Sequence, residues 1–460
     1  MVGRGIHRRA SIFTRGELGP WHTRGCAAPH RLPAAVPGPS PGTCHRPGPS
    51  EGVELTDLLL TELDRELLNG KAGPGTALAM SVVTQMAKAM GAGRLLDISA
   101  AHIDGCLYHG RAGLDFALRL VEGGARTAVP ATLNVAALDL LHPDLYRGDP
   151  DTAREARRLM DAYLSLGCVP SWTCAPYQLP GRPHRGQQIA WAESNAIVFA
   201  NSVLGARTER YGDFLDISCA VTGRAPAVGL HLDGGRTATW VAVLRGLDEW
   251  LDADWLYPVL GYELGLIDPV GIPALIGLDT RATEDRLKAL GAGAASTGAI
   301  AMFHAVGVTP EAGTLDEASG GRRLPRVVID RDRILAARQR LSRGAKGPVS
   351  AVSLGAPHYS AAELTRLSGW LQGRQVNLPL FVNTNRQAMT AAAAEVSILE
   401  RAGATIVTDT CTYITPILDP GIKVVMTDSA KWAYYAPGNL GVGVVFGSPE
   451  ECVAVALRES

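Results

Sequence analysis

TIVTDTCTYITPILDPGIKVVMTDSAKWAYYAPGNLG, residues 405–441, contains two short apolar runs that each end in polar residues. The first run leads to Cys411, and the second leads to Ser429 and Lys431. Such runs predict neighbouring strands, and ligands of open α/β sheets bind outside the carboxyl ends of the strands. We therefore expect a site at these strand ends, although a lone cysteine is most often a small buried core residue.

The composition indicates a globular protein with sizeable cores. A length of 460 residues suggests about two to four domains, and 46% of the residues are hydrophobic. The net charge of -1 gives no electrostatic sign of nucleic-acid or membrane binding, and no apolar run is long enough to span a bilayer. Eight cysteines without close spacing do not indicate a secreted disulfide framework, so we expect a cytoplasmic protein.

Helical and strand patterns alternate along most of the chain, which predicts layered α/β domains with mainly parallel sheets. Residues 1–52 are rich in Pro and Arg, lack periodicity, and are expected to form a disordered tail. We expect α/β domains with the catalytic motifs across residues 53–345 and a C-terminal α/β domain across residues 346–460.

Three finer predictions concern single elements. Apolar residues from Leu55 to Leu67 recur at helical spacing. From Pro325 onward, the strand VVID, the helix after it and the later strand–helix pairs read as one compact unit. The last long helix of that unit is expected across 386–402.

Polar residues follow several of the predicted strands. Any one of them alone is most often a helix cap, a turn residue or a satisfied structural residue, so their number and common placement favour a site. The chain has no CxxC pair, P-loop or GxSxG motif. Cysteines from distant strand ends are compatible with an iron or iron–sulfur centre. The polar residues singled out are Ser99, His102, Asp104, Gly105, Asn134, Ser194, Asn195, Arg207, Arg210 and His358.

Eight motifs in order along the chain resemble the aconitase X family, a divergent branch of the aconitase superfamily. Together they extend over nearly all of the chain after residue 54. The motifs are ISAAHIDG (98–105), VPATLN (129–134), PSWTCAPY (170–177), ESNAIVFANSVLGARTERYGDFLDI (193–217), TGRAP (222–226), LGAPHYS (354–360), TDTC (408–411) and SAKWAYYAPG (429–438).

The resemblance implies a hydro-lyase with an aconitase-like fold and an active site at strand ends between domains. Bacterial members dehydrate cis-3-hydroxy-L-proline to Δ1-pyrroline-2-carboxylate, and archaeal members dehydrate mevalonate 5-phosphate. We expect the first activity, with the large subunit of a mevalonate 5-phosphate dehydratase as the alternative. A non-catalytic binding subunit is the alternative from another functional class.

The resemblance also implies iron bound through cysteines. Cys174 and Cys411 match two ligand positions of the family, whereas the third cysteine position holds Ala356. This departure disfavours a 4Fe–4S cluster held by three cysteines. It leaves a 2Fe–2S cluster or mononuclear iron, completed by Cys106, Cys219, the substrate or water.

Dehydration beside a carboxylate needs a base for the α proton and help for the departing hydroxide. The catalytic candidates are His102, Asp104 and Lys431, and His102 paired with a carboxylate would protonate the hydroxide. Arg207, Arg210 or Lys431 would neutralise the substrate carboxylate, although the two arginines are as well explained by salt bridges. The substrate-binding candidates are Ser99, Gly105, Cys106, Leu107, Asn134, Ser194, Asn195, Arg207, Arg210, His358 and Ser429.

In this family the catalytic base is a serine in a separate small swivelling domain, which is fused or forms a partner subunit. Gly3-Arg4-Gly5 is similar to the end of that domain's motif, but Ile6 stands where the serine is expected. We expect either a large subunit with a stray tail or a fused protein truncated by a wrong start. The expected partners are a hydroxy acid substrate and a small swivel-domain subunit.

Overall fold

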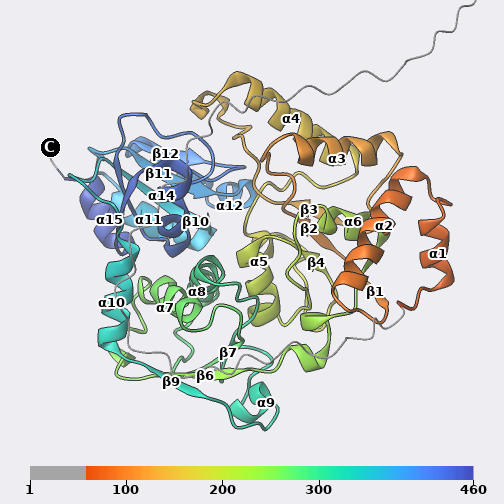
Figure 1. Cartoon of the computed structure of the whole chain (residues 1–460). Coiled ribbons are helices and arrows are strands. Elements are labelled where there is room, and N and C mark those ends of the chain that lie inside the picture. The colour runs from red at the N-terminus through yellow and green to blue at the C-terminus, as the bar shows by residue number, and fades with distance from the viewer. Residues whose placement is uncertain (1–57, 459–460) are drawn as a thin grey trace, which may run out of the picture. The chain divides into compact units, whose positions relative to one another are not determined.

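The computed structural model describes residues 58–458, and its strands fall into three regions along the chain (Figure 1). We call these the N-terminal region, with β1–β5, the middle region, with β6–β9, and the C-terminal region, with β10–β14. The predicted tail, residues 1–52, lies outside the described residues. Across residues 58–458, no helix is both long and apolar enough to cross a membrane.

In the N-terminal region, a parallel sheet in the order β3-β2-β4 brings three strand ends together. The carboxyl ends of parallel strands meet at one edge, so Asp104, Asn134 and Glu193, which follow these strands, converge there. β1 and β5 form a separate antiparallel pair. The strands are β1 Leu95–Asp97, β2 Ala101–Ile103, β3 Ala131–Leu133, β4 Ala190–Trp191 and β5 Arg224–Pro226. The helices are α1 Glu62–Leu68, α2 Pro74–Ala89, α3 Arg111–Glu122, α4 Pro150–Ser165, α5 Ser194–Phe199 and α6 Leu215–Thr222.

The middle region is a parallel sheet in the order β8-β7-β6-β9 with the closely packed helices α7 and α8. A Cβ added at Gly261 of α7 would lie 1.9 Å from the carbonyl oxygen of Leu290 of α8, so this close crossing requires glycine. The strands are β6 Trp240–Leu244, β7 Pro273–Ile276, β8 His304–Ala305 and β9 Arg326–Ile329. The helices are α7 Leu256–Ile267, α8 Glu284–Thr297, α9 Leu315–Ser319 and α10 Arg331–Leu341.

The C-terminal region is a five-stranded parallel sheet in the order β12-β11-β10-β13-β14. All nine residues of its central strand β10 are buried, as expected for a strand covered on both faces. The strands are β10 Ala351–Tyr359, β11 Leu380–Thr384, β12 Ala404–Val407, β13 Val424–Thr427 and β14 Gly443–Phe446. The helices are α11 Ala361–Leu371, α12 Arg386–Ala391, α13 Ala393–Arg401, α14 Ala430–Leu440 and α15 Pro449–Ala456.

The hydrophobic core joins these regions. One cluster of buried residues runs from the middle region into the C-terminal region and includes both Cys174 and Cys411. A second fills the N-terminal region, and a third lies against the C-terminal sheet. The cysteine at the end of β12 is therefore a buried core residue as well as a strand-end residue.

The predicted class, α/β with mainly parallel sheets, is confirmed, but three finer predictions are wrong. α1 begins at Glu62, because the Thr61 side chain accepts a hydrogen bond from the Asp64 amide and caps the helix there; the described residues before it, 58–61, are not helical. β9 pairs with β6, so the strand VVID belongs to the middle region. The helix predicted across 386–402 is broken at Ala392, whose backbone leaves helical geometry at φ -117° and ψ 40°.

Candidate active site

Cys174, His358 and Cys411 meet at the junction of the N-terminal and C-terminal regions. Their potential metal-binding atoms all lie within 4.8 Å of one another, and all three residues are buried. Cys174 follows the segment beside β3, His358 is near the end of β10, and Cys411 follows β12. Two thiols and an imidazole are ligands that suit iron and zinc, so this group can bind a metal ion.

The histidine of this group is held in one orientation. Its Nε2 lies 2.9 Å from the carbonyl oxygen of Thr410, which requires Nε2 to donate a proton. Nδ1 then carries a lone pair, with the hydroxyl of Thr173 at 3.1 Å. A metal-binding histidine typically donates its second ring nitrogen to a backbone carbonyl in this way. Nδ1 is therefore the ring nitrogen that a metal would take, in place of its hydrogen bond with the Thr173 hydroxyl.

The two thiols are electrostatically unequal. The backbone N–H of His358 donates to the sulfur of Cys174 at 3.3 Å. Burial alone would raise the pKa of Cys174, but a hydrogen bond from Cys411 lowers it. The nearby His358 and Lys431 act in the same direction, and the pKa falls below its ordinary value. The same hydrogen bond, together with burial, raises the pKa of Cys411. The pair therefore favours one thiolate, which is the form of cysteine that binds metals.

A cavity of about 750 Å³ opens beside this group and includes Cys174 in its wall. It lies between the strand ends of the N-terminal region and the segment that follows β12. The other lining residues are Asp104, Leu107, Tyr108, His109, Asn134, Val135, Ala137, Tyr146, Gly148, Asp149, Thr152, Glu193, Ser194, Tyr413, Ile414, Thr415, Pro416, Lys431, Tyr435 and Asn439.

A buried ion pair between Lys431 and Glu193 forms part of the cavity wall. Glu193 also caps α5 by accepting the Ala196 amide at 2.8 Å. Burial would lower the pKa of Lys431, but the carboxylate of Glu193 outweighs it and keeps that pKa above its ordinary value. The amine is therefore charged, and its charge is balanced by Glu193.

Asp104 is a second unusual group in the wall. Burial raises the pKa of its carboxyl to about 7, and the carboxylates of Glu193 and Asp213 act in the same direction. The side-chain amide of Asn134 donates to it. Behind it, Asp216 accepts the amide of Asp104 at 2.8 Å and fixes the loop after β2. A carboxyl with a pKa near 7 can both give and take a proton at neutral pH.

The structure places six of the sixteen predicted site residues in the wall of this cavity. Asn195 and Gly105 lie just behind the wall: the Asn195 amide donates to the carbonyl oxygen of Cys174 at 3.0 Å, and the Gly105 amide donates to Asp216. Cys106 is also behind it, with its thiol directed at the carbonyl oxygen of Asn134. The predicted residues that line the cavity are Asp104, Leu107, Asn134, Cys174, Ser194 and Lys431.

Other predicted residues lie elsewhere. His102 is fully buried against Thr132, and burial lowers the pKa of its ring to about 4, so it is neutral. Ser99 donates to the carbonyl oxygen of Gln188. The remaining three residues, with their positions, are Arg207 in an ion pair with Asp233, Arg210 at the exposed surface, and Ser429 capping α14.

Two features of the site went unrecognised in the sequence. His358 was expected to bind substrate, yet it joins the two cysteines, whereas neither Cys106 nor Cys219 is part of the group found within residues 58–458. The sequence signal for His358 as a member of this group was its position in LGAPHYS, two residues after Ala356. Glu193, the partner of Lys431, begins the motif ESNAIV but could not be paired from sequence alone.

Comparison with known proteins gives one consistent family. Three family models match, described as Aconitase X first domain over residues 57–234, Aconitase X second domain over residues 241–339 and Aconitase X third domain over residues 349–458. A solved structure, the holo-form of Thermococcus kodakaraensis aconitase X, has a TM-score of 0.78 and 30% sequence identity. That comparison covers 86% of this chain and 100% of the other.

Curated relatives fall into two groups by name. Cis-3-hydroxy-L-proline dehydratase of Pseudomonas aeruginosa is 44% identical, covering 86% of this chain and 70% of the relative. The enzyme of the same name from Hypocrea jecorina is 41% identical, covering 86% of this chain and 68% of the relative. The phosphomevalonate dehydratase large subunit of Methanothermobacter thermautotrophicus is 35% identical, covering 84% of this chain and 96% of the relative.

Proposed function

The chain belongs to the aconitase X family, and we propose that it is a dehydratase that converts cis-3-hydroxy-L-proline to Δ1-pyrroline-2-carboxylate. In this reaction the α carbon gives up a proton and its neighbour gives up hydroxide, and the resulting enamine tautomerises to the imine. The observation that carries the proposal is the buried group Cys174, His358 and Cys411 beside a cavity with titratable walls.

We propose that these three residues hold iron, as a 2Fe–2S cluster or as a single ion. In this proposal His358 is the third ligand. It replaces the third cysteine of the family, whose position is occupied by Ala356 in this chain. Three protein ligands leave a coordination position open, as in other catalytic metal sites. Bound iron would act as a Lewis acid toward the substrate hydroxyl.

Asp104 is the proposed proton donor to the leaving hydroxide. It lines the cavity, and its pKa of about 7 leaves it partly protonated at neutral pH. His102 suits this role less well, because its ring is buried against Thr132 and neutral. Lys431, held by Glu193, is placed to orient the substrate carboxylate.

The charges of the cavity wall favour hydroxyproline over mevalonate 5-phosphate. Among the described lining residues, Lys431 is the one Lys or Arg, and Glu193 already balances its charge. Mevalonate 5-phosphate carries a phosphate as well as a carboxylate, and the described lining residues include no second Lys or Arg to bind the phosphate. The carboxylate of Asp149, another lining residue, instead suits the ring ammonium group of hydroxyproline. The higher identity to the two hydroxyproline dehydratases agrees with this choice.

A small swivel-domain subunit is the proposed source of the base that removes the α proton. The match covers 96% of the M. thermautotrophicus large subunit but 70% of the P. aeruginosa dehydratase. We expect turnover to require the partner.

Iron and sulfide analysis of anaerobically purified protein tests the metal site. Cys174→Ala, Cys411→Ala and His358→Ala should each remove the iron while leaving the protein folded. Cys219→Ala, which changes a buried thiol outside the group, should keep it. About two iron and two sulfide ions per chain would indicate a 2Fe–2S cluster, and about one iron without sulfide would indicate a single ion. Iron-free wild-type protein would instead favour a non-catalytic binding subunit.

A further inference from the structure

Four side chains join the first turns of α8 and α11 in a closed polar network. Lys288 forms an ion pair with Glu363 and lies 3.1 Å from a carboxylate oxygen of Asp285. The hydroxyl of Ser360 donates to the other oxygen of Asp285 at 2.9 Å. The amide of Ser360 donates to Glu363 at 2.7 Å and closes the ring. We call these four residues the α8–α11 clamp.

The clamp is largely removed from solvent. The side chain of Lys288 is 3% exposed and that of Glu363 is 12% exposed. Away from water, each charge depends on its partners, because an unpaired buried charge is costly. A network of this kind is rigid when all of its members are satisfied. The clamp therefore fixes α8 of the middle region against the start of α11 in the C-terminal region.

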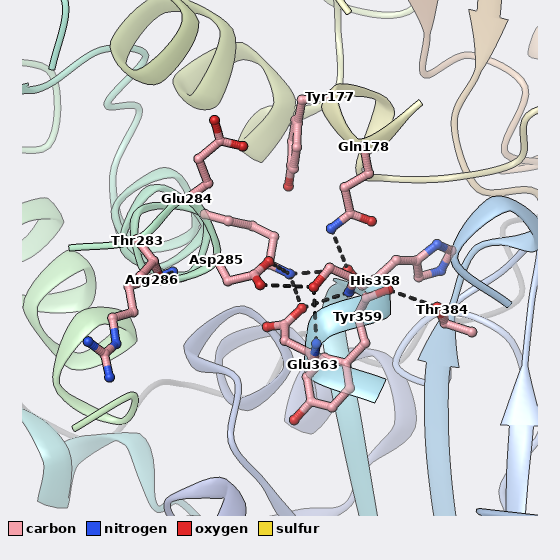
Figure 2. Close-up of polar contacts among 12 residues, drawn as sticks. Tyr177, Gln178, Thr283, Glu284, Asp285, Arg286, His358, Tyr359, Glu363 and Thr384 are labelled. Carbon is pink, nitrogen blue, oxygen red and sulfur yellow. Dashed lines mark hydrogen bonds and ion pairs between the residues drawn. The ribbon is translucent and has the colours of Figure 1, made fainter. Parts of the chain in front are cut away.

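The backbone held by the clamp is that of the histidine in the metal-binding group. Lys288 Nζ lies 3.4 Å from the carbonyl oxygen of His358, and the side-chain amide of Gln178 lies 3.4 Å from the same oxygen. The next carbonyl, that of Tyr359, accepts the hydroxyl of Thr384 at 2.8 Å. Figure 2 shows the side-chain amide of Gln178 directed at the backbone of His358, with Asp285 and Glu363 beside it. Side chains from all three regions thus converge there.

We infer that Lys288 is a positioning residue for His358, an inference that rests on the proposed metal site. Lys288 does not contact the imidazole ring; it acts through the main chain, at the carbonyl of His358 and through Glu363 at Ser360. Metal ligands function only when held to within about 0.5 Å of their productive geometry. Loss of groups that orient a ligand typically costs about 10–100-fold in metal affinity.

Cobalt titration distinguishes a role of Lys288 in positioning His358 from a general contribution of Lys288 to the stability of the fold. Co²⁺ is added anaerobically to the metal-free full chain, and the thiolate-to-cobalt absorption band reports binding. The band should be lost in Cys174→Ala and His358→Ala. Lys288→Met should weaken Co²⁺ binding by about 10–100-fold at a temperature where its circular dichroism matches wild type.

A matched control is Arg224→Met, which breaks the buried ion pair of Arg224 with Asp64 in the N-terminal region. It should lower the melting temperature without changing the affinity for Co²⁺. The double variant Lys288→Met/Glu363→Gln removes both charges, so it avoids an unpaired carboxylate and serves if the single variant fails to fold. Its Co²⁺ affinity should stay reduced.

The outcomes distinguish this inference from the proposed function. Wild-type affinity for Co²⁺ in the folded Lys288→Met protein or the double variant would overturn the positioning role alone. Wild-type protein without a thiolate-to-cobalt band would overturn both the metal site and the positioning role. A weakened band in the clamp variants, with an unchanged Arg224→Met control, supports both.

Discussion

Two cavities of similar size differ in how their charges are partnered. The first, about 750 Å³, adjoins the cysteine–histidine group, and the second, about 610 Å³, lies between Arg207 and the segment after β8. In the second, Arg236 donates to the two carboxylate oxygens of Glu311 through Nε and Nη2, and Arg207 pairs with Asp233. In the first, a thiol has a lowered pKa and Asp104 has one of about 7.

The difference shows that size and polarity do not identify a reactive site. In the second cavity, the charges of Arg207 and Arg236 are each balanced by a carboxylate, so these ion pairs have ordinary structural roles. The wall of the first cavity combines a thiol of lowered pKa and a titratable carboxyl, which is the combination expected of a catalytic site. Arg207 lies inside the motif of residues 193–217 but lines the second cavity.

Breaking one buried ion pair in each cavity should give the largest contrast. Lys431→Met leaves Glu193 unpaired in the first cavity, and Arg236→Met leaves Glu311 without its partner in the second. Each should lower the free energy of unfolding by about 3–5 kcal/mol, measured by urea denaturation. Turnover per folded molecule should collapse in Lys431→Met and persist in Arg236→Met. Equal loss of turnover in both variants would remove the distinction between the cavities.

Asp104→Asn should lower the activity and raise the stability of the protein at alkaline pH. A carboxyl whose pKa is raised to about 7 on folding costs stability as the pH rises from about 4 to about 7. The variant cannot ionise, so it should match wild type near pH 4 and exceed its melting temperature at pH 8. Its kcat should fall by about 10²–10⁴-fold if Asp104 donates the proton. A melting temperature below that of wild type at pH 8 would contradict the raised pKa.

Arg207→Ala should have the smallest effect. Its partner Asp233 is 89% exposed, and such pairs contribute about 0–1 kcal/mol to stability. KM should therefore stay within about twofold of wild type, with Arg210→Ala as a second test. A tenfold rise in KM for either variant would restore the sequence-based prediction that these arginines bind the substrate carboxylate.

The sequence predicted the parallel α/β architecture because buried strands and their helices leave distinct local patterns. The prediction failed where a local contact or a distant partner decides the outcome. The Thr61 cap sets the start of α1, and β9 pairs with β6 of the middle region. Cys174 and Cys411 were singled out through family resemblance. Spacing alone could not place His358 beside them, because 184 residues separate it from Cys174.

The role of single histidines was hardest to predict, because it depends on burial and hydrogen bonds. His102 and His358 each stand in a family motif at a predicted strand end. Folding buries His102 against Thr132, away from the cavity, and turns Nε2 of His358 toward Thr410, which leaves Nδ1 available. The sequence alone does not show which of the two histidines lies beside the cysteines.

The most direct test of the central claim is turnover of cis-3-hydroxy-L-proline by the iron-loaded chain with a small swivel-domain subunit. We predict formation of Δ1-pyrroline-2-carboxylate by wild type, faster than any dehydration of mevalonate 5-phosphate, and none by Cys174→Ala. Turnover by Cys174→Ala at the wild-type rate, or none by the iron-loaded wild-type complex, would contradict the account.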